Sequence, residues 1–384
     1  MKRLAFALIA LALLPAFAFG LSVPSRVSSI QWKDARSLGM GDASLLFSSG
    51  YDTFFGNPAG FAEKGSLTLT DISICSYPPI MEDEINHLSG MLDNSLSAAD
   101  RDAYLNSWLT TNGRLGGGAS IGLGWAGNGF GLGVNMVSDL ALVGDSYENS
   151  RLYIANQMNA VAGFGVPIQL GFLKISLGAD ARGFYRIDSS RWSAYDIINA
   201  AFGYTDDFEA VIDDEILFGG FGYAFDAGIT LRAGPLMAGF MARNLFAKLD
   251  VEVTTVGEID DNDSLPTDQT YPVAYEPTYT AGLGLRFWEK GLFAPSFYAQ
   301  TSDIEGFMTA IGDGSDVVAT MQIGGELRIL RLLLLRAGLD ENFMTIGAGV
   351  DLALLRVDAA IFIDPFNNLV DGAQGMALRA SLKL

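Results

Sequence analysis

Few side chains in this sequence have the type and spacing that catalysis requires. His87 is its only histidine, and Cys75 is its only cysteine. Any catalytic triad would have to use His87, which lies far in sequence from any convincing nucleophile. A single cysteine excludes both an internal disulfide and a cysteine-based metal cluster. We therefore expect no catalytic residue, and the protein is not expected to be an enzyme.

The glycine-rich and acid-rich segments do not match known ligand-binding loops. Gly116–Gly118 and the alternating glycines of 127–131 lie in strand and hairpin contexts with no following helix, so they do not support phosphate binding. Segments 188–219 and 247–276 each carry eight acidic residues and one basic residue, without the ligand spacing of a calcium loop. This favours solvated loops over a metal site. The net charge of −20 argues against a nucleic-acid partner, and no metal or cofactor is expected.

From about residue 65 onward, the sequence repeats one pattern. Segments of eight to twelve residues alternate large apolar residues with small or polar ones, as Phe221–Leu231 does. This is the period of a strand with two unlike faces. The predicted strands are 66–77, 117–125, 130–139, 158–166, 172–187, 220–232, 235–246, 277–288, 292–301, 318–329, 332–339, 344–353, 355–363 and 375–384.

The connections between these strands alternate in length. Long ones are expected at 78–116, 140–157, 188–219, 247–276, 302–317 and 364–374, with tight turns between them. The pair Asn128-Gly129 is a typical hairpin turn. Only 340–343 departs from the alternation, being short where a long loop is expected. Long loops at one end and tight turns at the other are typical of an outer-membrane barrel, and an even strand count places both termini in the periplasm.

Composition agrees with an all-β transmembrane antiparallel barrel of about fourteen strands. Hydrophobic residues make up 49% of the chain, charged residues only 18%, and there are 45 glycines. The face opposite the large apolar residues is rich in glycine and alanine mixed with Asp, Arg and Ser, which suits a narrow, partly filled lumen. The alternative is a soluble β-sandwich or β-helix, which would keep its large apolar residues inside. The pattern favours the membrane barrel.

The N-terminal region divides into two parts. Residues 1–18 have a positive start, an apolar run and a small-residue cleavage pattern, as in a secretory signal peptide. An uncleaved anchor helix is the less favoured alternative. Residues 19–64 do not alternate and are punctuated by glycine, which predicts an N-terminal plug ahead of a barrel at 65–384. The expected location is the bacterial outer membrane.

The plug contains two short motifs. One is Ala-Arg-Ser-Leu-Gly-Met-Gly-Asp-Ala at 35–43, and the other runs from Asp52 to Asn-Pro-Ala-Gly at 57–60. Together they resemble the N-terminal signature of the FadL superfamily of outer-membrane transporters. The resemblance is greatest to the spirochaetal, TraF-like and PorV-like branch, which is not proven to move lipid. It is specific over about 30 residues and architectural elsewhere. One departure is the C-terminal Leu384 in place of the phenylalanine common in barrels.

The resemblance implies a hatch that closes the barrel from the periplasmic side. The implied plug or gating residues share the two motifs and are Gly39, Gly41, Asn57, Pro58, Ala59 and Gly60. Movement of the hatch would open a path from a hydrophobic lumen. The alternative is that the Asn-Pro-Ala element only ends a turn and packs the plug, without gating.

The long segment 78–116 changes to a helical period. Ser97–Asp100 resembles a capping box, and four apolar residues fall at helical spacing: Tyr104, Leu105, Trp108 and Leu109. We favour a helix packed over the barrel mouth. The alternative is an exposed ligand-binding lip that captures an amphiphile, as the FadL resemblance implies.

Two functions follow from this reading. The first is passive, plug-gated transport of hydrophobic or amphiphilic molecules, such as long-chain fatty acids, motivated by the plug motif and by a lumen face with few charges. The second is a surface-exposed or secretion-associated barrel that docks a protein partner through its acidic loops, without transport. The sequence fixes neither the ligand nor the direction of transport. Expected partners are the membrane lipid and a hydrophobic small molecule.

Overall fold

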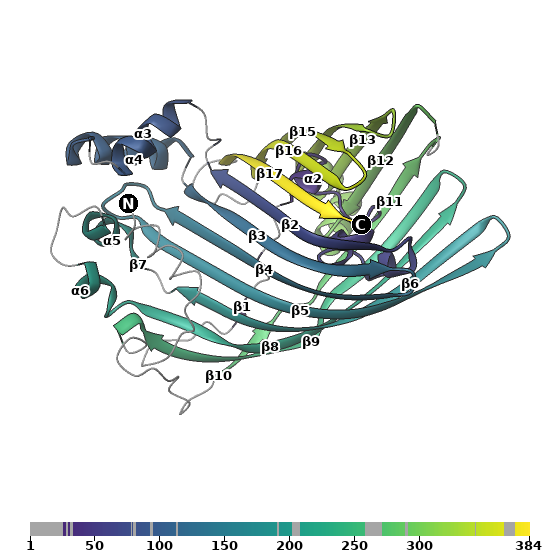
Figure 1. Cartoon of the computed structure of the whole chain (residues 1–384), viewed down its shortest axis with the longest axis horizontal. Coiled ribbons are helices and arrows are strands. Elements are labelled where there is room, and N and C mark those ends of the chain that lie inside the picture. Colours follow the sequence, from purple (N-terminus) through teal and green to yellow (C-terminus); the bar gives the residue numbers. More distant parts are fainter. Residues whose placement is uncertain are drawn as a thin grey trace.

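The computed structural model describes most of the chain after its N-terminal segment (Figure 1). The described residues are 26–27, 30, 34–77, 79, 82–92, 95–112, 114–189, 192–201, 208–257, 271–288, 291–341, 343–364 and 373–384. The expected signal peptide, residues 1–18, lies outside them, as does most of the expected plug before residue 34. Among the described residues, no helix is long and apolar enough to cross a bilayer.

Fourteen strands of the described chain form one closed antiparallel barrel. Each pairs with the next, and the last pairs with the first, so that no long edge is left open. In order they are β2 (Ser66–Tyr77), β3 (Arg114–Gly127), β4 (Phe130–Val143), β5 (Arg151–Leu170), β6 (Leu173–Ser189), β8 (Ile216–Ala233), β9 (Leu236–Thr255), β11 (Thr278–Arg286), β12 (Phe293–Thr301), β13 (Gln322–Ile329), β14 (Leu333–Asp340), β15 (Phe343–Asp351), β16 (Leu355–Asp364) and β17 (Ala373–Lys383). All fourteen predicted strands are present, but some bounds differ. The predicted loop 140–157 is reduced to 144–150, because β4 and β5 extend into it, and residues 318–320 of the predicted strand 318–329 form a 3-10 helix, η3 (Val318–Thr320).

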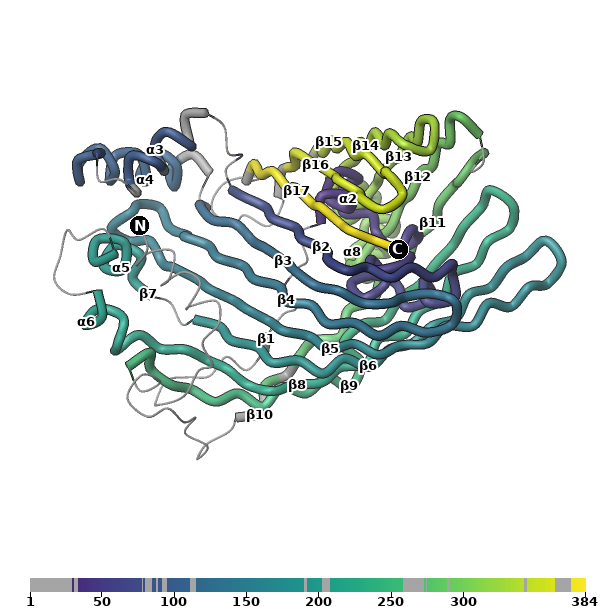
Figure 2. Tube along the Cα trace, viewed as in Figure 1, coloured from purple at the N-terminus to yellow at the C-terminus, as the bar shows by residue number. Residues whose placement is uncertain are grey.

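Tight turns and long connections lie at opposite ends of the barrel (Figure 2). The turn at Asn128-Gly129 has positive φ at both residues, 55° and 102°, as the predicted hairpin requires. The connection between β14 and β15 is short, as predicted. The barrel begins and ends at the turn end, where Leu67 and Leu384 exchange backbone hydrogen bonds of 3.0 and 2.7 Å.

The wall is taller on one side than the sequence pattern predicts. Strands β5, β6, β8 and β9 have 17 to 20 residues, whereas β11 to β16 have 8 to 10. Part of the segment expected as an acidic loop, 247–276, is strand: β9 runs to Thr255, and β10 (Tyr271–Tyr275) pairs beside it. A two-residue strand, β1 (Arg26–Val27), pairs with β10 in parallel.

The loop-end part of β9, from Lys248 onward, shows why the sequence predicts a loop where the structure has a strand. There the apolar residues Leu249, Val251 and Val253 are buried, while Lys248 and Asp250 are solvent-accessible and paired with each other at 2.7 Å. In the part of the wall nearer the turn end the apolar face points outward, whereas here it points inward. A strand that has left the hydrocarbon layer must turn polar residues to water. The acidic residues that indicated a loop, such as Asp250, lie on the outer face of β9 where this strand extends beyond the lipid.

The part of the wall nearer the turn end carries its large apolar residues on the outside. Leu132, Phe164 and Leu283 are at least 60% exposed, and many neighbours on the same face are similarly exposed. A contiguous apolar surface of this extent is rare on a water-soluble protein. The outer face therefore suits lipid hydrocarbon, and it contradicts the soluble sandwich, whose large apolar residues would be covered.

Helices and a short strand cover the loop end. They are α3 (Glu82–Leu92), α4 (Ala98–Asn112), β7 (Trp192–Ser193), α5 (Ala194–Ala201) and α6 (Phe208–Ile212). Half of the predicted capping box is present: the Asp100 backbone N–H donates to Ser97 Oγ at 3.2 Å, and Ser97 Oγ donates to the Asp100 carboxylate at 2.6 Å. Leu105 and Leu109 are buried in a cluster with Trp192. They do not form an exposed lip, because α4 turns its apolar face onto the other loops.

The other two residues of the predicted lip are half-buried. The ring of Tyr104 stacks on His87 at a centroid distance of 4.0 Å, and Trp108 contacts Tyr104 edge-on at 6.2 Å. His87 is thus a packing residue between α3 and α4. All four side chains of the predicted lip therefore pack, wholly or in part, against neighbouring residues of the loop end.

Candidate functional site: the plug and its seat

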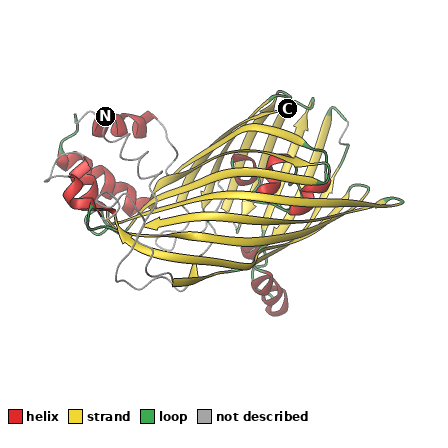
Figure 3. Cartoon of the chain, turned by 60° about the horizontal axis from the view of Figure 1, so that its bottom comes forward, coloured by secondary structure: helices red, strands yellow, loops and turns green. Residues whose placement is uncertain are grey.

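The plug lies within the barrel, towards the turn end (Figures 1 and 3). Its described elements are α2 (Ala35–Leu38), η1 (Gly50–Phe54) and η2 (Pro58–Ala62). Each is short, so none would be stable alone. Helix α2 is held by its cap: the Asp34 carboxylate accepts from the backbone N–H groups of Arg36 and Ser37 at 3.2 and 3.1 Å. The rest of the stabilisation must come from contacts with the wall.

The first motif brings the plug backbone against the wall. A Cβ on Gly39 would lie 3.0 Å from Gly347 Cα. Gly41 has a φ of +63°, its N–H donates to Thr345 Oγ1 at 2.9 Å, and a Cβ there would lie 2.2 Å from the carbonyl oxygen of Leu339. Glycine is required at Gly41 for both its φ and its close approach. These two predicted plug residues are therefore contact points with β14 and β15.

The second motif caps η2. Asn57 Oδ1 accepts from the Ala59 N–H at 3.0 Å, and Pro58 occupies the first helical position, where a missing N–H costs nothing. The Asn57 N–H donates to Ser48 Oγ at 2.9 Å, and its amide contacts the Ile229 carbonyl at 3.4 Å. Asn57 thus ends a turn and also links the plug to β8.

Replacing Asn57 with alanine is expected to destabilise the plug by about 1–2 kcal/mol, because a capping acceptor is lost at a fully buried position. Asn57→Ser keeps a neutral capping acceptor and should lose less. Limited proteolysis of the folded barrel would measure this, with cleavage at Lys64 faster in Asn57→Ala than in Asn57→Ser. Equal cleavage of both variants and the parent would show that the cap is unimportant.

Glycines of the wall form the surface on which η2 rests. Gly165, Gly178 and Gly228 are direct cross-strand partners on β5, β6 and β8, and we call them the glycine seat. A Cβ would lie 2.4 Å from the Ala62 nitrogen at Gly165, 2.0 Å from the Pro58 oxygen at Gly178 and 1.9 Å from Asn57 Oδ1 at Gly228. The glycine-rich inner face is therefore matched to the plug backbone.

A second glycine pair receives the first motif. Gly324 and Gly338 are cross-strand partners on β13 and β14, and a Cβ on either would lie within 2.3 Å of the Met40 backbone. Aromatic plug residues fill the remaining space, with Phe54 and Phe61 in edge-on contact at 5.8 Å. Phe61 itself is completely buried, against Gly131 and Gly163 of the wall.

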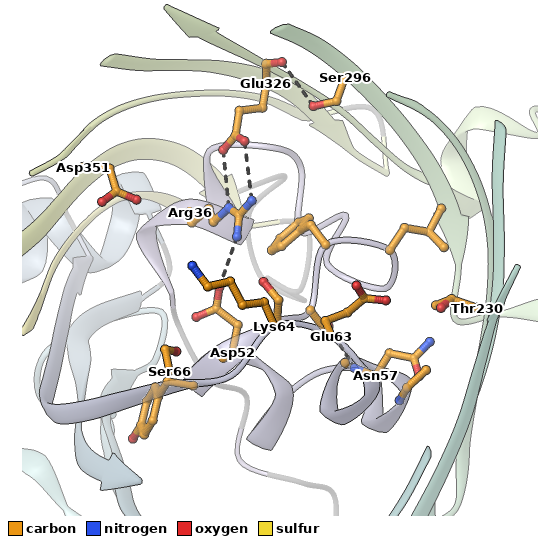
Figure 4. A pocket seen from close by; sticks show the side chains of 18 of the residues that line it. Arg36, Asp52, Asn57, Glu63, Lys64, Ser66, Thr230, Ser296, Glu326 and Asp351 are labelled. Atoms are coloured by element: carbon orange, nitrogen blue, oxygen red, sulfur yellow. Dashed lines mark hydrogen bonds and ion pairs between the residues drawn. The ribbon is translucent and has the colours of Figure 1, made fainter. Parts of the chain in front are cut away.

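Charged side chains join the plug to the opposite wall. Arg36 of α2 contacts Asp52 of η1 at 3.2 Å and Glu326 of β13 at 3.3 Å, as Figure 4 shows. Its guanidinium also lies 4.1 Å from the centre of the Phe47 ring. One arginine therefore connects both halves of the plug to the barrel.

Arg379 makes the second connection. Its guanidinium, on β17, contacts Asp34 at 2.9 Å and Asp71 of β2 at 2.8 Å, and also pairs with Asp52. The side chains of Asp34 and Asp71 are fully buried. Arg379 thus holds two plug carboxylates and the strand pair that closes the barrel.

Further wall residues extend these pairs. Arg336 lies between Glu326 and Asp358, at 2.9 and 2.8 Å, and Arg356 contacts Asp358 at 2.6 Å. We call the connected set the plug network: Asp34, Arg36, Asp52, Asp71, Glu326, Arg336, Arg356, Asp358 and Arg379. Its four arginines and five carboxylates nearly balance. Desolvated charges need such partners, and removing one leaves the others uncompensated.

The plug network is not predictable from the strand pattern. Arg36 and Asp52 belong to the two plug motifs, and that was the available signal. The lumen was expected to carry few charges, and this is wrong: Arg336, Asp358 and Arg379 are inward-facing and buried. Alternation shows which face a residue occupies, but it does not show that distant inward positions meet.

The plug is also tied to β8 and β9. Arg243 donates to the Phe55 carbonyl oxygen and contacts Asp226 at 3.3 Å. Asp226 in turn accepts from the Asn244 N–H at 2.7 Å. Asn244 has a φ of 56°, where β9 departs from regular pairing with β8. The plug therefore contacts the wall on two sides. The plug network and one glycine pair hold it on one side, and the glycine seat and Arg243 hold it on the other.

The protonation of Asp52 gives the plug a pH limit. Burial by itself would raise the pKa of Asp52, but Arg379 and then Arg36 outweigh it, and the pKa falls from 3.8 to about 2. Because the pKa in the seated plug is depressed, the stabilisation from Asp52 is complete above about pH 4 and is lost as the pH falls towards 2.

We therefore expect the plug to stay seated from pH 7 to about pH 4 and to loosen below about pH 3. Conductance of single barrels in planar bilayers would show this as a rise at acid pH. Asp52→Asn should conduct more than the parent already at pH 7 and should lack the part of the acid rise that Asp52 contributes. Identical pH profiles for the two proteins would contradict this role of Asp52.

A cavity of about 800 Å³ lies between the plug and the turn end, and we call it the vestibule (Figure 4). The plug contributes Arg36, residues 45–52, Asn57, Ala59, Gly60, Glu63 and Lys64 to its lining, and the rest comes from the wall and Leu384. Its lining includes nine arginine or lysine residues and four aspartate or glutamate residues. In a protein of net charge −20, the vestibule is therefore unusually cationic. A volume of this size is in the range of small-molecule sites.

Comparison with known proteins gives no sequence match but several similar structures. No family model and no curated protein matches the sequence. The toluene transporter TodX of Pseudomonas putida is 12% identical, with 93% of this chain and 98% of that chain covered at a TM-score of 0.47. The toluene transporter TbuX of Ralstonia pickettii is 10% identical (90% and 96% covered, TM-score 0.45). A FadL homologue of Pseudomonas aeruginosa is 11% identical (96% and 99% covered, TM-score 0.44).

One of these structures is named for the family that the plug motifs resemble. At such identities and TM-scores the likeness assigns no ligand to this chain. The evidence for the closed barrel and its plug is the strand pairing and the plug contacts described above.

Proposed function

We propose that this protein is an outer-membrane channel for amphiphilic molecules, with long-chain fatty acids as its substrate class, and that displacement of the plug opens it. Both ends of the barrel domain would then lie in the periplasm. The proposal rests on one observation: the plug is held inside a closed barrel by ion pairs and close packing. These contacts can be lost while the strand pairing of the wall stays intact. The backbone of residues 57–62 rests on glycine rather than pairing as a strand.

The vestibule supports an acidic amphiphile over a neutral hydrocarbon. Apart from the plug network, whose arginines and carboxylates nearly balance, its lining has six cationic side chains against the two carboxylates Glu63 and Asp351. A carboxylate head would be attracted to this excess of positive charge. Lys174 is already paired with Glu63 at 2.6 Å, and Lys383 with Asp351 at 2.8 Å. A carboxylate ligand would compete with these partners for partly exposed cations, which favours reversible binding.

Uptake into proteoliposomes tests this function. A long-chain fatty acid should enter vesicles containing the protein faster than vesicles without it, and faster than the alcohol of the same chain length. Gly178→Ala, which should displace the plug, is expected to raise uptake. Gly183→Ala, on the outer face of the same strand with nothing within 4 Å of the added methyl, is the matched control.

Mass spectrometry of the purified barrel gives an independent measurement. A retained acyl chain is expected. The proposal would be wrong if no acyl chain is retained, the fatty acid and the alcohol cross at the rate of empty vesicles, and the barrel conducts ions steadily.

A second candidate is docking of a protein partner through the loop end. The observation that favours it is the packed cluster under α4 and α5, which gives this end a defined surface beside acidic residues. Deleting 188–219 or 247–276 whole would cut into β6, β8 and β9, so charge changes are the better test. Neutralising Asp213, Asp214 and Glu215 should weaken a docking partner without changing fatty-acid uptake.

A further inference from the structure

Helix α8 (Ile304–Asp313) lies apart from the other helices. It connects β12 to β13, two of the shortest strands, and contacts β11. In Figure 3 it is the helix on the outside of the wall, away from both the loop-end helices and the plug. It is a complete element: the Asp303 carboxylate caps its start by accepting from the Gly306 N–H at 2.9 Å, and Gly314 ends it with a φ of 76°.

The residues of α8 divide into three faces. At about 100° per residue, Phe307, Met308 and Ile311 share one face, and Glu305, Thr309 and Asp313 share another. Ala310 points in a third direction, roughly 100° from each of these faces, and it is only 4% exposed. The small residue therefore marks the side that contacts the wall. The apolar and polar faces lie on either side of it.

The described part of the chain leaves most of the apolar face uncovered, although Phe307 is half-buried. Met308 is 61% exposed and Ile311 is 55% exposed. The apolar wall continues beside α8, where Leu283 of β11 and Phe297 of β12 are also more than half exposed. That wall must contact lipid chains if the barrel spans a bilayer. The same hydrocarbon is therefore within reach of the apolar face of α8.

Strand length supports the same position. Strand β12 has nine residues, the lower limit for a tilted strand that crosses the apolar layer, and β13 has eight, one fewer. Neither strand has residues to spare beyond that layer. The chain between them must then leave the wall at the membrane boundary. A helix there would have protein on one side, hydrocarbon on the second and water on the third, and this is the division of faces in α8.

We propose that α8 is an interfacial helix whose Phe307–Met308–Ile311 face inserts among the lipid acyl chains of the leaflet at the loop end. It would lie in the plane of the membrane, with its apolar side about 5–10 Å into the boundary between headgroups and chains. The helix thereby sets the height of the bilayer on the short side of the barrel. The longer strands opposite then project beyond the membrane. This inference depends on the barrel spanning a bilayer and is independent of what the barrel transports.

Fluorescence quenching in vesicles tests the position of α8. Cys75 is buried and is first replaced by serine, so that single cysteines can be labelled. Met308→Cys and Thr309→Cys, adjacent on α8, each receive a small environment-sensitive fluorophore. Leu283→Cys on the wall is the reference. The full-length barrel is placed in phosphatidylcholine vesicles that carry bromine on the acyl chains, or in ordinary vesicles with iodide in the surrounding water.

The probe at Met308 should lose most of its fluorescence to brominated lipid and little to iodide, and the probe at Thr309 should do the reverse. Bromine close to the headgroup should quench the probe at Met308 more than bromine close to the chain end, because α8 is shallow. The proposal is wrong if iodide quenches both positions equally, which would place α8 in water. It is also wrong if neither quencher reaches Met308, which would indicate a protein partner or a second copy.

The probe at Leu283 shows whether a negative result concerns only α8 or the insertion of the whole barrel into the bilayer. If the probe at Leu283 is quenched by brominated lipid but the probe at Met308 is not, only the proposal for α8 fails. If neither is quenched, the wall is not in the bilayer, and the proposed function fails with it. Folding of each variant is checked by its resistance to unfolding in detergent at room temperature.

Discussion

Arg379→Met is expected to destabilise the seated plug more than any other single substitution. The change leaves Asp34, Asp52 and Asp71 buried without their shared cation. Removing one partner of a buried ion pair typically costs about 3–5 kcal/mol, because the remaining charge has lost its solvent and gained nothing in exchange. Two of the three carboxylates belong to the plug, so most of this cost falls on the plug rather than on the barrel.

The expected result is a barrel that forms but conducts. Single-channel recordings should show frequent open states in Arg379→Met, whereas the parent is mostly closed at neutral pH. Arg151→Met, at an exposed arginine of β5, is the control and should behave like the parent. Adding Asp71→Asn to Arg379→Met should restore part of the closed state by removing one uncompensated charge. An unchanged conductance in Arg379→Met would mean that the plug network does not hold the plug.

Gly178→Ala is the second substitution with a large expected effect. The added methyl would lie 2.0 Å from the Pro58 carbonyl oxygen and 2.6 Å from the Ala59 nitrogen, both backbone atoms. The wall cannot yield easily, because Gly178 is paired on both sides, with Gly165 and Gly228. Overpacking of this kind costs about 1–3 kcal/mol, which shifts the plug equilibrium by up to about a hundredfold.

Gly183→Ala isolates this effect. Both glycines lie on β6, so the loss of strand flexibility is the same, but Gly183 is exposed and an added methyl would touch nothing within 4 Å. Open-channel current and the rate of proteolysis at Lys64 should rise in Gly178→Ala and stay at the parental level in Gly183→Ala. Equal values for the two variants would show that the glycine seat does not position the plug.

The strand pattern could be predicted because it is a local property. Alternation along Phe221–Leu231 gives the strand and its two faces without knowledge of any neighbour. The turn residues Asn128 and Gly129 likewise act through their own φ. The sequence predicts a loop for the loop-end part of β9, because the apolar face of the strand is reversed where the wall leaves the lipid. The burial of Leu105 depends on β7 and α5, which lie about 90 residues later.

The sequence by itself determined the strands and their two faces, the turn and loop ends, and a glycine-punctuated plug segment, because each depends on the period or conformation of neighbouring residues. Only the tertiary structure decided how the plug is held. Arg36 and Glu326 are 290 residues apart, and Asp34 and Arg379 are 345 apart. Alternation indicates that Glu326 and Arg379 face inward, but ring closure and the register of fourteen strands decide what they meet. The same closure turns the inward glycines Gly165, Gly178 and Gly228 into one surface, because they become neighbours only when β5, β6 and β8 pair.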